Sequence, residues 1–365
     1  MDRRSAMKLT SGALALAGLG AAGAPRPTRA AAIQAPVVDR LSIRVLIDSS
    51  FDLFFRPSKV NGVAIAPPPR FADYRRTLHN EWGLSLWLES QRGAEQRTVL
   101  LDYGYSPNVL FNNMELIGVD PHKIDAMIVS HGHYDHFGGL IGFLDKFRGQ
   151  LPAAITLYAG GEDNFCHRYG GSGSQLSDFG MLDRRELAAR NVKLVLAEQP
   201  AIVADHAFTT GRIARAGIER VLPNTQVEFG IKDGAGCDAG KYLSADMNGK
   251  TVPDEHLHEH ASCFHVKDKG LVVISSCGHV GIVNSVRQAQ QVSGVSKVHA
   301  IVGGFHLGPA PKDYLTQVVA EIRKLEPDVL IPMHCSGLNF VQEARAQMPE
   351  NVLVTTTGSR ITFGA

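Results

Sequence analysis

Short runs of branched apolar residues recur along the chain and alternate with segments that have one apolar and one polar face. Each run has the length of a buried strand, whereas residues 314–325 have the period of an amphipathic helix. Strands are predicted at 41–47, 79–88, 98–102, 124–130, 155–158, 192–196, 270–276, 298–302, 329–331, 352–356 and 361–363. Helices are predicted at 140–147, 282–291 and 314–325, and another, capped by Ser106 or Asn108, runs through 114–117. This alternation predicts an α/β fold with layers of sheet and helices outside.

The periodic pattern is interrupted between residues 160 and 258. Gly160-Gly161 and Gly170-Gly171-Ser172-Gly173-Ser174 predict mobile, surface-exposed chain over residues 160–180, and residues 200–258 have few periodic apolar positions. Long loops in a compact domain are usually functional covers, so we expect a lid or insert at about 160–258 that selects the substrate. Arg212 and Arg215 are the expected substrate contacts, with a solvated loop carrying two surface arginines as the alternative.

Three imidazoles and a carboxylate directly follow the predicted strand 124–130, in the sequence His131-Gly132-His133-Tyr134-Asp135-His136. Imidazole and carboxylate are ligands of zinc, iron and manganese. His131 and His133 can point the same way in an extended turn, and the adjacent Asp135 and His136 can reach a second point. Two metal ions roughly 3.5–4 Å apart would satisfy this geometry and would suit hydrolysis.

Four ligands from one loop cannot saturate two metal ions, so later strand ends must contribute. His279 and His334 both follow runs of branched apolar residues, as His131 does, and are the expected further ligands. His260 is a third candidate, because it continues the period-two series of His256 and His258; a polar, exposed loop is the alternative.

Other side chains near these histidines are expected to support the metal ions. Cys277 ends the strand 270–276 and either binds as a thiolate or only packs. Asp102 is expected to hold a ligand histidine, and His306 is expected to orient a ligand or to contact the substrate.

These motifs resemble the metallo-β-lactamase superfamily of metallohydrolases. Residues 131–136 resemble its signature, and 270–279, 303–307 and 332–335 are similar to one branch, the 7,8-dihydropterin-6-methyl-4-(β-D-ribofuranosyl)aminobenzene-5'-phosphate synthase-like proteins. The resemblance covers roughly residues 41–363. It implies an αββα four-layer sandwich of two mixed sheets, with the metal ions at one end between them and His334 as the last ligand histidine. The bridging aspartate of the superfamily is absent by position, because Cys277 stands there.

The predicted function is that of a metal-dependent hydrolase with two zinc ions, or iron or manganese in their place. Zinc lowers the pKa of a bound water to about 7, so a metal-bound hydroxide would attack a small ester, lactone or phosphoester. Asp135 would bind one metal ion and position the nucleophile or accept its proton, and Tyr134 would either donate to the substrate or only pack. Two alternatives stay open: a dihydropterin-type synthase activity on the same fold, and a metal-binding protein without turnover.

The first 32 residues change the expected location. Arg3-Arg4 resembles a twin-arginine export motif, the apolar run 12–24 is too short to span a bilayer, and 30–32 are small residues typical of a cleavage site. We therefore expect a signal cleaved near 30–32 and a periplasmic domain of 33–365 without stable membrane insertion. The expected partners are the twin-arginine export machinery and a small-molecule substrate.

The net charge and the cysteines add little to the predicted function. The 37 basic and 36 acidic residues nearly cancel, so no nucleic-acid partner is implied. The five cysteines, an odd number, cannot all pair, and although an oxidising compartment permits a disulfide, their spacing indicates none. Cys277 and Cys335 are expected near the metal ions because each is close in sequence to a candidate ligand. The oligomeric state is not predicted.

Overall fold

The computed structural model describes residues 32–172, 175–222, 224–238, 240 and 247–364, so the predicted signal segment lies outside it except for residue 32. Two large sheets form its centre. The first has the order β11 (Lys193–Leu196), β8 (Thr156–Ala159), β7 (Ala126–Val129), β6 (Glu95–Leu101), β5 (Ser85–Arg92), β2 (Arg40–Ile47), β22 (Arg360–Phe363), β4 (Val63–Ala66) and β3 (Ser58–Val60). The second has the order β12 (Ile202–Val203), β13 (Ala207–Thr209), β18 (Ser262–Val266), β19 (Gly270–Ser275), β20 (Val298–Gly303) and β21 (Val329–Pro332), with β1 (Val37–Val38) paired to β18.

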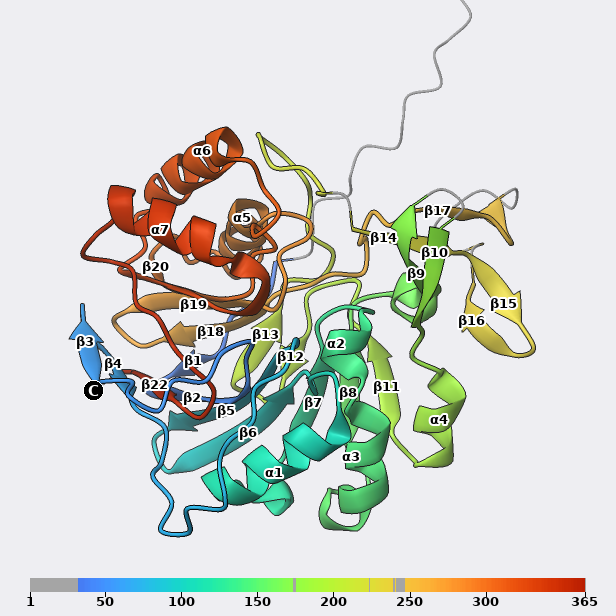
Figure 1. Cartoon of the computed structure of the whole chain (residues 1–365), viewed down its shortest axis with the longest axis horizontal. Coiled ribbons are helices and arrows are strands. Elements are labelled where there is room, and N and C mark those ends of the chain that lie inside the picture. Colours follow the sequence, from blue (N-terminus) through green and yellow to red (C-terminus); the bar gives the residue numbers. More distant parts are fainter. Residues whose placement is uncertain (1–31, 173–174, 223, 239, 241–246, 365) are drawn as a thin grey trace, which may run out of the picture.

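Helices cover the outer face of each sheet (Figure 1). Helices α1 (Pro107–Ile117) and α3 (Leu140–Phe147) lie on the first sheet, and α5 (Ile282–Ser293), α6 (Lys312–Arg323) and α7 (Leu338–Gln347) lie on the second. The order is therefore helix, sheet, sheet, helix, which confirms the predicted αββα architecture.

The buried apolar residues form three clusters that match these layers. Successive residues of β19 show why: Val272 packs between the sheets with Ile128 of β7, whereas Leu271 and Val273 pack outward against Val286 of α5. Because side chains alternate along a strand, a strand covered on both faces is apolar throughout. A third cluster, which includes Phe143 of α3, fills the outer face of the first sheet.

Parallel strands carry the site. Strands β6, β7 and β8 are parallel neighbours in the first sheet, and β19, β20 and β21 in the second. Helices α5 and α6 make the crossovers of the second set. The carboxyl ends of neighbouring parallel strands lie at one edge of a sheet, so the loops that follow them are brought together.

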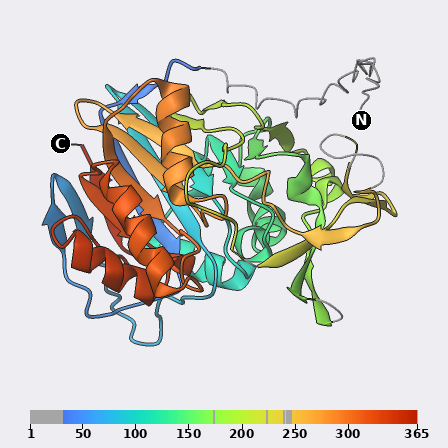
Figure 2. The same ribbon diagram turned by 90° about the horizontal axis from the view of Figure 1, so that it is seen from above.

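The region expected to be a long loop contains two small sheets. One has the order β10 (Gln175–Gly180), β9 (His167–Ser172), β14 (Thr225–Glu228) and β17 (Thr251–Pro253), and the other pairs β15 (Gly230–Lys232) with β16 (Ala235–Cys237). Figures 1 and 2 show both small sheets extending from one end of the sandwich. The expectation of exposed, mobile chain at 160–180 was wrong for its first part, because Phe165 and Cys166 are buried. The role of 160–258 as a lid stays a prediction.

The remaining short helices are α2 (Tyr134–Phe137), α4 (Arg184–Ala189), η1 (Pro121–Lys123), η2 (Arg148–Gln150), η3 (Glu162–Phe165) and η6 (His334–Ser336). Two predicted strands differ from the structure: the one at 79–88 begins only at Ser85, and that at 352–356 is reduced to a single bridge between Val352 and Leu330. Among the described residues, no helix has the length and apolar character needed to cross a membrane.

Candidate metal centre

Two groups of three metal-ligating side chains meet where β7, β19 and β21 end. Within each group the donor atoms lie within 4.8 Å of one another, and every member is buried. The first group is His131, His133 and His279; the second is Asp135, His136 and His334. All six were expected as ligands: His131, His279 and His334 from their positions directly after buried strands, and His133, Asp135 and His136 from their places in the loop that follows His131.

The loop after β7 divides its donors between the two groups. His131 and His133 lie before α2, and the backbone of His133 is extended, with φ −90° and ψ 143°. Asp135 and His136 lie inside the single turn of α2. The change from extended to helical chain sends the first two side chains to one group and the next two to the other.

Asp102 holds the second group in place, as predicted. Its Oδ2 lies 2.8 Å from Nδ1 of His136 and accepts a hydrogen bond from the hydroxyl of Ser130 at 2.7 Å. Fixing Nδ1 in this way leaves Nε2 of His136 directed at the site. His334 is held similarly, since its Nδ1 lies 3.1 Å from the hydroxyl of Ser49.

The donor set fits a divalent metal ion. Nε2 of His131, Nε2 of His279 and Oδ1 of Asp135 are buried and have no hydrogen-bond partner in the described part of the chain. Burial holds the pKa of His131 well below its usual value, and the neighbouring His136 lowers it further. This imidazole is therefore neutral, and its lone pair is free. Burial alone would raise the pKa of Asp135, but His136 and His334 lower it, so this group is a carboxylate. Buried polar atoms without partners are costly unless something binds them.

His260 does not join either group. Its Nε2 lies 3.0 Å from the carbonyl oxygen of Val129, and His279 completes the set with His131 and His133 instead. The period-two argument for His260 fails because 256–260 is not a strand: β18 begins at Ser262, and His256 has a left-handed backbone with φ 47°.

His256 is a neighbour of the centre that the sequence argument did not assign. Its ring stacks on that of His279 with centroids 4.0 Å apart and lies 4.9 Å from that of His133. Neither of its ring nitrogens has a hydrogen-bond partner among the described residues, and burial lowers its pKa to about 3. The three histidines at 256, 258 and 260 are the sequence feature that could have placed His256 near the centre.

Glu259 positions the loop that carries His279. Its carboxylate accepts the backbone N–H groups of His279 at 3.0 Å and Val280 at 2.8 Å. Burial raises the pKa of Glu259 to about 7, although both of these hydrogen bonds act in the opposite direction.

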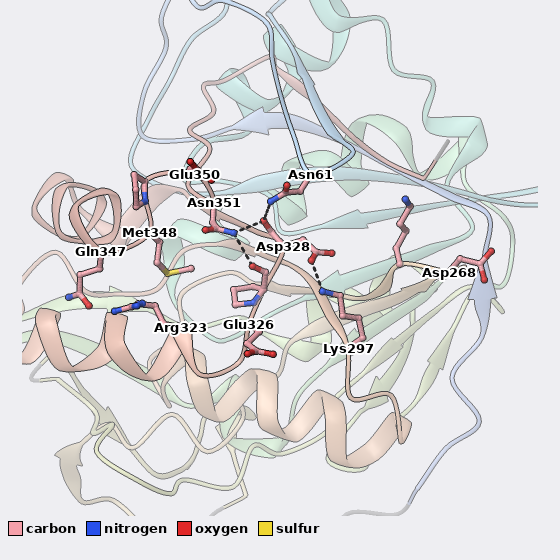
Figure 3. A pocket seen from close by; sticks show the side chains of 13 residues that line it. Asn61, Asp268, Lys297, Arg323, Glu326, Asp328, Gln347, Met348, Glu350 and Asn351 are labelled. Atoms are coloured by element: carbon pink, nitrogen blue, oxygen red, sulfur yellow. Dashed lines mark hydrogen bonds and ion pairs between the residues drawn. The ribbon is translucent and has the colours of Figure 1, made fainter.

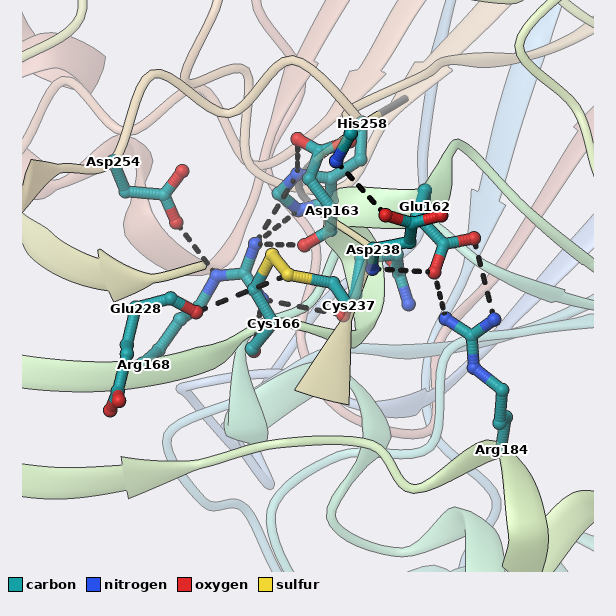
Figure 4. Close-up of a disulfide and its surroundings, with 12 residues drawn as sticks. Glu162, Asp163, Cys166, Arg168, Arg184, Glu228, Cys237, Asp238, Asp254 and His258 are labelled. Carbon is teal, nitrogen blue, oxygen red and sulfur yellow. Dashed lines mark hydrogen bonds and ion pairs between the residues drawn. A yellow bond between two sulfur atoms is a disulfide. The ribbon is translucent and has the colours of Figure 1, made fainter. Parts of the chain in front are cut away.

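A buried arginine ties the segment 254–258 to η3 and β9 (Figure 4). Arg168 is fully buried; its Nε donates to Asp254 at 2.7 Å and its guanidinium also donates to the carbonyl of Asp163 at 2.8 Å. His258 lies 2.9 Å from the Asp163 carboxylate and accepts the backbone N–H of Gly132, between two ligand histidines, at 2.9 Å. Two residues from Arg168, Cys166 forms a disulfide with Cys237, which the spacing of the cysteines did not indicate.

The expected substrate contacts have varied surroundings. Tyr134 packs in an aromatic cluster, with its ring centroid 5.0 Å from that of Tyr105. His306 lies against His279, with centroids 4.2 Å apart. Arg212 donates to the carbonyl of Leu257, and Arg215 forms an ion pair with Glu255. Their roles as substrate contacts stay predictions.

A large cavity of about 890 Å³ lies at the other edge of the second sheet (Figure 3). Lys297 and Asp328 line it, and they directly precede β20 and β21, whereas the candidate metal ligands follow the strands. The carbonyl of Asp328 accepts hydrogen bonds from the side-chain amides of Asn61 and Asn351. This cavity is therefore not part of the metal centre.

Comparisons with known proteins agree with the fold. A profile of the metallo-β-lactamase superfamily matches residues 87–157, which include the candidate ligands His131, His133, Asp135 and His136. A solved structure of a metal-dependent hydrolase of the β-lactamase superfamily superposes with a TM-score of 0.63 at 21% identity, covering 88% of this chain and 98% of the other. The protein therefore has the metallo-β-lactamase fold, and the resemblance to the superfamily is confirmed.

Two curated relatives come from Methanocaldococcus jannaschii. The 7,8-dihydropterin-6-methyl-4-(β-D-ribofuranosyl)-aminobenzene-5'-phosphate synthase is 27% identical over 271 residues, which is 73% of this chain and 85% of the relative. An uncharacterised protein of the same organism is 25% identical over 247 residues, 66% of this chain and 80% of that protein. The predicted similarity to the synthase-like branch is thus confirmed.

Proposed function

We propose that the protein is a metal-dependent hydrolase that acts on a small ester, lactone or phosphoester. One observation carries the proposal: two buried donor groups, of three histidines and of two histidines with a carboxylate, lie side by side at one end of the sandwich. His131 of the first group and His136 of the second have ring centroids only 4.2 Å apart. Such paired sites suit two metal ions, for which we propose zinc, with iron or manganese as alternatives.

The chain contributes positioning and proton transfer. Bound divalent metal ions supply Lewis-acid chemistry and lower the pKa of a coordinated water to about 7. Asp135 is ionised and directs one oxygen, Oδ2, to within 3.3 Å of Nε2 of His334, while Oδ1 has no partner in the described residues. We assign to the Asp135 carboxylate two tasks: holding one metal ion, and orienting the attacking water or accepting its proton.

We propose that the substrate approaches past two aromatic side chains. Trp82, 55% exposed, packs on His334 with ring centroids 4.8 Å apart. On the other group, Phe179 lies 5.4 Å from His133 and is half-buried. An apolar mouth above buried polar donors is typical of small-molecule sites.

The test is metal analysis followed by a substrate panel. Protein purified from its own host is expected to hold at least two metal ions per chain, to hydrolyse a member of a panel of esters, lactones and phosphoesters, and to lose turnover on chelation. His131→Ala is expected to lose metal and activity together, because it removes a donor from the first group. His122→Ala, an exposed histidine on η1, is the matched control. Metal and activity retained in His131→Ala would place the site elsewhere.

A synthase activity is the second candidate, because the relative with 27% identity is named as a synthase. Its test is incubation of the metal-loaded protein with a pterin precursor and a phosphoribosyl substrate, with product detected by mass spectrometry. Formation of a condensed product, together with no turnover on the hydrolase panel, would replace the first proposal with this one.

We also propose export through the twin-arginine machinery to the periplasm, on the strength of Arg3-Arg4 and the small residues 30–32. Mass spectrometry of the periplasmic fraction is expected to find a mature N-terminus near residues 30–32. Replacement of both arginines by lysine is expected to retain the full-length chain in the cytoplasm.

A further inference from the structure

Three neighbouring parallel strands of the second sheet each release a further donor beside the histidine-rich groups. Cys277 follows β19, His306 follows β20 and Cys335 follows β21. Because β19 pairs with β20 and β20 with β21, all in parallel, the three side chains come from adjacent positions along one edge. Their donor atoms lie within 4.8 Å of one another.

The two thiols are close but not bonded. Their sulfur atoms lie 3.2 Å apart, whereas the Cys166–Cys237 disulfide has an S–S distance of 2.00 Å. Two thiolates in a tetrahedral zinc site, each about 2.3 Å from the ion, lie roughly 3.8 Å apart. A displacement of about half an ångström, within reach of a side-chain rotation, would bring the pair to that separation.

The surroundings suit sulfur bound to a metal. Both cysteines are almost fully buried, at 2% and 4% exposure. The backbone N–H of His306 donates to the sulfur of Cys335 at 3.2 Å, an arrangement that stabilises a metal-bound thiolate. Nδ1 of His306 is buried and has no hydrogen-bond partner in the described residues. The backbone of His306 is left-handed, with φ 45°, which is a costly conformation for a non-glycine residue.

We propose that Cys277, His306 and Cys335 bind a divalent metal ion of the zinc class in a sulfur-rich site that adjoins the two histidine-rich groups. Cys277 connects it to them, since its sulfur lies 3.4 Å from Nε2 of His136. Thiolate and imidazole together select zinc and other soft or borderline ions over magnesium and manganese. The site concerns metal content and does not depend on which reaction the protein catalyses.

Cobalt substitution tests this site through the absorption of the bound metal. Thiolate ligands give cobalt(II) an intense charge-transfer band in the near ultraviolet that imidazole and carboxylate do not give. We expect the full chain loaded with Co²⁺ to show this band, and Cys277→Ser/Cys335→Ser to lose the band and about one metal ion per chain. His131→Ala is expected to keep the band. Cys263→Ser is the matched control, because Cys263 is a buried free thiol on β18 outside the donor groups of the described residues.

Single cysteine variants distinguish this sulfur-rich site from an arrangement in which only one cysteine binds a metal ion. Loss of the band in Cys277→Ser with full retention in Cys335→Ser would overturn the proposal, because Cys277 would then serve only a histidine-rich group. A Cys277–Cys335 disulfide, found by mass spectrometry of the unreduced protein, would overturn it too. X-ray absorption of the zinc-loaded wild type needs no variant: a zinc–sulfur shell at about 2.3 Å is expected, and a spectrum with nitrogen and oxygen neighbours only would refute the site.

Discussion

Three candidate ligand histidines of the metal centre, His133, His136 and His334, each have one ring nitrogen held by a neighbouring side chain. Nδ1 of His136 is held by Asp102 and Nδ1 of His334 by Ser49, while Nε2 of His133 lies 3.0 Å from the hydroxyl of Thr225. In each imidazole one nitrogen is occupied and the other is left for the site. In His260, by contrast, the occupied nitrogen faces the backbone of β7, at the carbonyl of Val129.

The first prediction separates His279 from His260. His279→Ala is expected to lower the metal content by about one ion per chain, because it removes a donor from the first group. His260→Ala is expected to keep its metal and to be destabilised by about 1–3 kcal/mol, because it leaves the Val129 carbonyl without its partner. Elemental analysis and denaturant unfolding measure the two effects, and metal loss in His260→Ala alone would reverse the assignment.

The second prediction concerns Trp82 at the mouth of the site. Trp82→Ala is expected to raise KM by about 2- to 10-fold for a substrate with an aromatic or planar group, since aromatic contacts contribute about 0.5–1.5 kcal/mol. Trp82→Phe is expected to restore most of the affinity. Tyr74→Ala, at a residue 93% exposed, serves as the control. Equal KM values in all three variants, with unchanged metal content, would remove Trp82 from the binding surface.

At the scale of elements, buried charges fasten the small sheet to the sandwich. The third prediction is that Arg168→Met, which leaves Asp254 without its buried partner, lowers the free energy of unfolding by about 3–5 kcal/mol. Arg185→Met, in a partly exposed pair with Asp183 at the N-terminus of α4, is expected to have a much smaller effect. Denaturant unfolding of both variants checks this, and equal losses would mean that burial does not decide the outcome.

The fourth prediction concerns the N-terminus of α5. Glu219 accepts the backbone N–H groups of Val283 at 3.0 Å and Asn284 at 2.8 Å, and burial raises its pKa from 4.5 to about 7. Because the folded-state pKa lies above that of the unfolded chain, the contribution of protonated Glu219 is complete below pH 4.5 and is lost as the pH rises to about 7. The loss is at most about 3 kcal/mol, and less because the side chain keeps some contact with solvent.

Glu219→Gln provides the comparison, because its amide does not titrate. Denaturant unfolding at several pH values between 4 and 8 is expected to show a steeper decline of stability for the wild type than for this variant. Parallel curves would show that Glu219 does not titrate in this window.

The sequence predicted elements where apolar periodicity was strong. Helix α3 covers residues 140–147, as its amphipathic pattern indicated, and β19, β20 and β21 lie within a residue or two of their predicted positions. Helix α7 was missed because only Phe340 and Ala344 of its ten residues are buried, which leaves no clear apolar stripe. The strands between 202 and 253 were missed because each has only two to four residues, too few to establish a period.

At the scale of the whole molecule, the sequence predicted the four layers. It did not show which histidine, His260 or His279, completes the group that contains His131 and His133. Buried strands can be predicted from their runs of branched apolar residues. The ends of β7, β19 and β21 could therefore be identified in the sequence as the positions that metal-ligating side chains follow. The pairing of His279 with His131 and His133 depends on how two sheets face each other, which no local pattern records. The Cys166–Cys237 disulfide spans 71 residues and also depends on the packing of η3 against β16.

The candidate metal centre draws its donors from both sheets, which leads to the last prediction. The loop after β7 belongs to the first sheet, whereas His279 and His334 follow strands of the second, so each donor group draws on both. A ligand that binds only the folded chain stabilises it by about 4 kcal/mol when its concentration is 1,000 times its Kd. Chelation is therefore expected to lower Tm by on the order of 10 °C, and restored zinc to reverse the change. In His131→Ala the response to zinc should be much smaller, because the first group is incomplete. If the metal leaves the wild-type protein without any change in Tm, the ions do not bridge the sheets, and the site must be held together by packing alone.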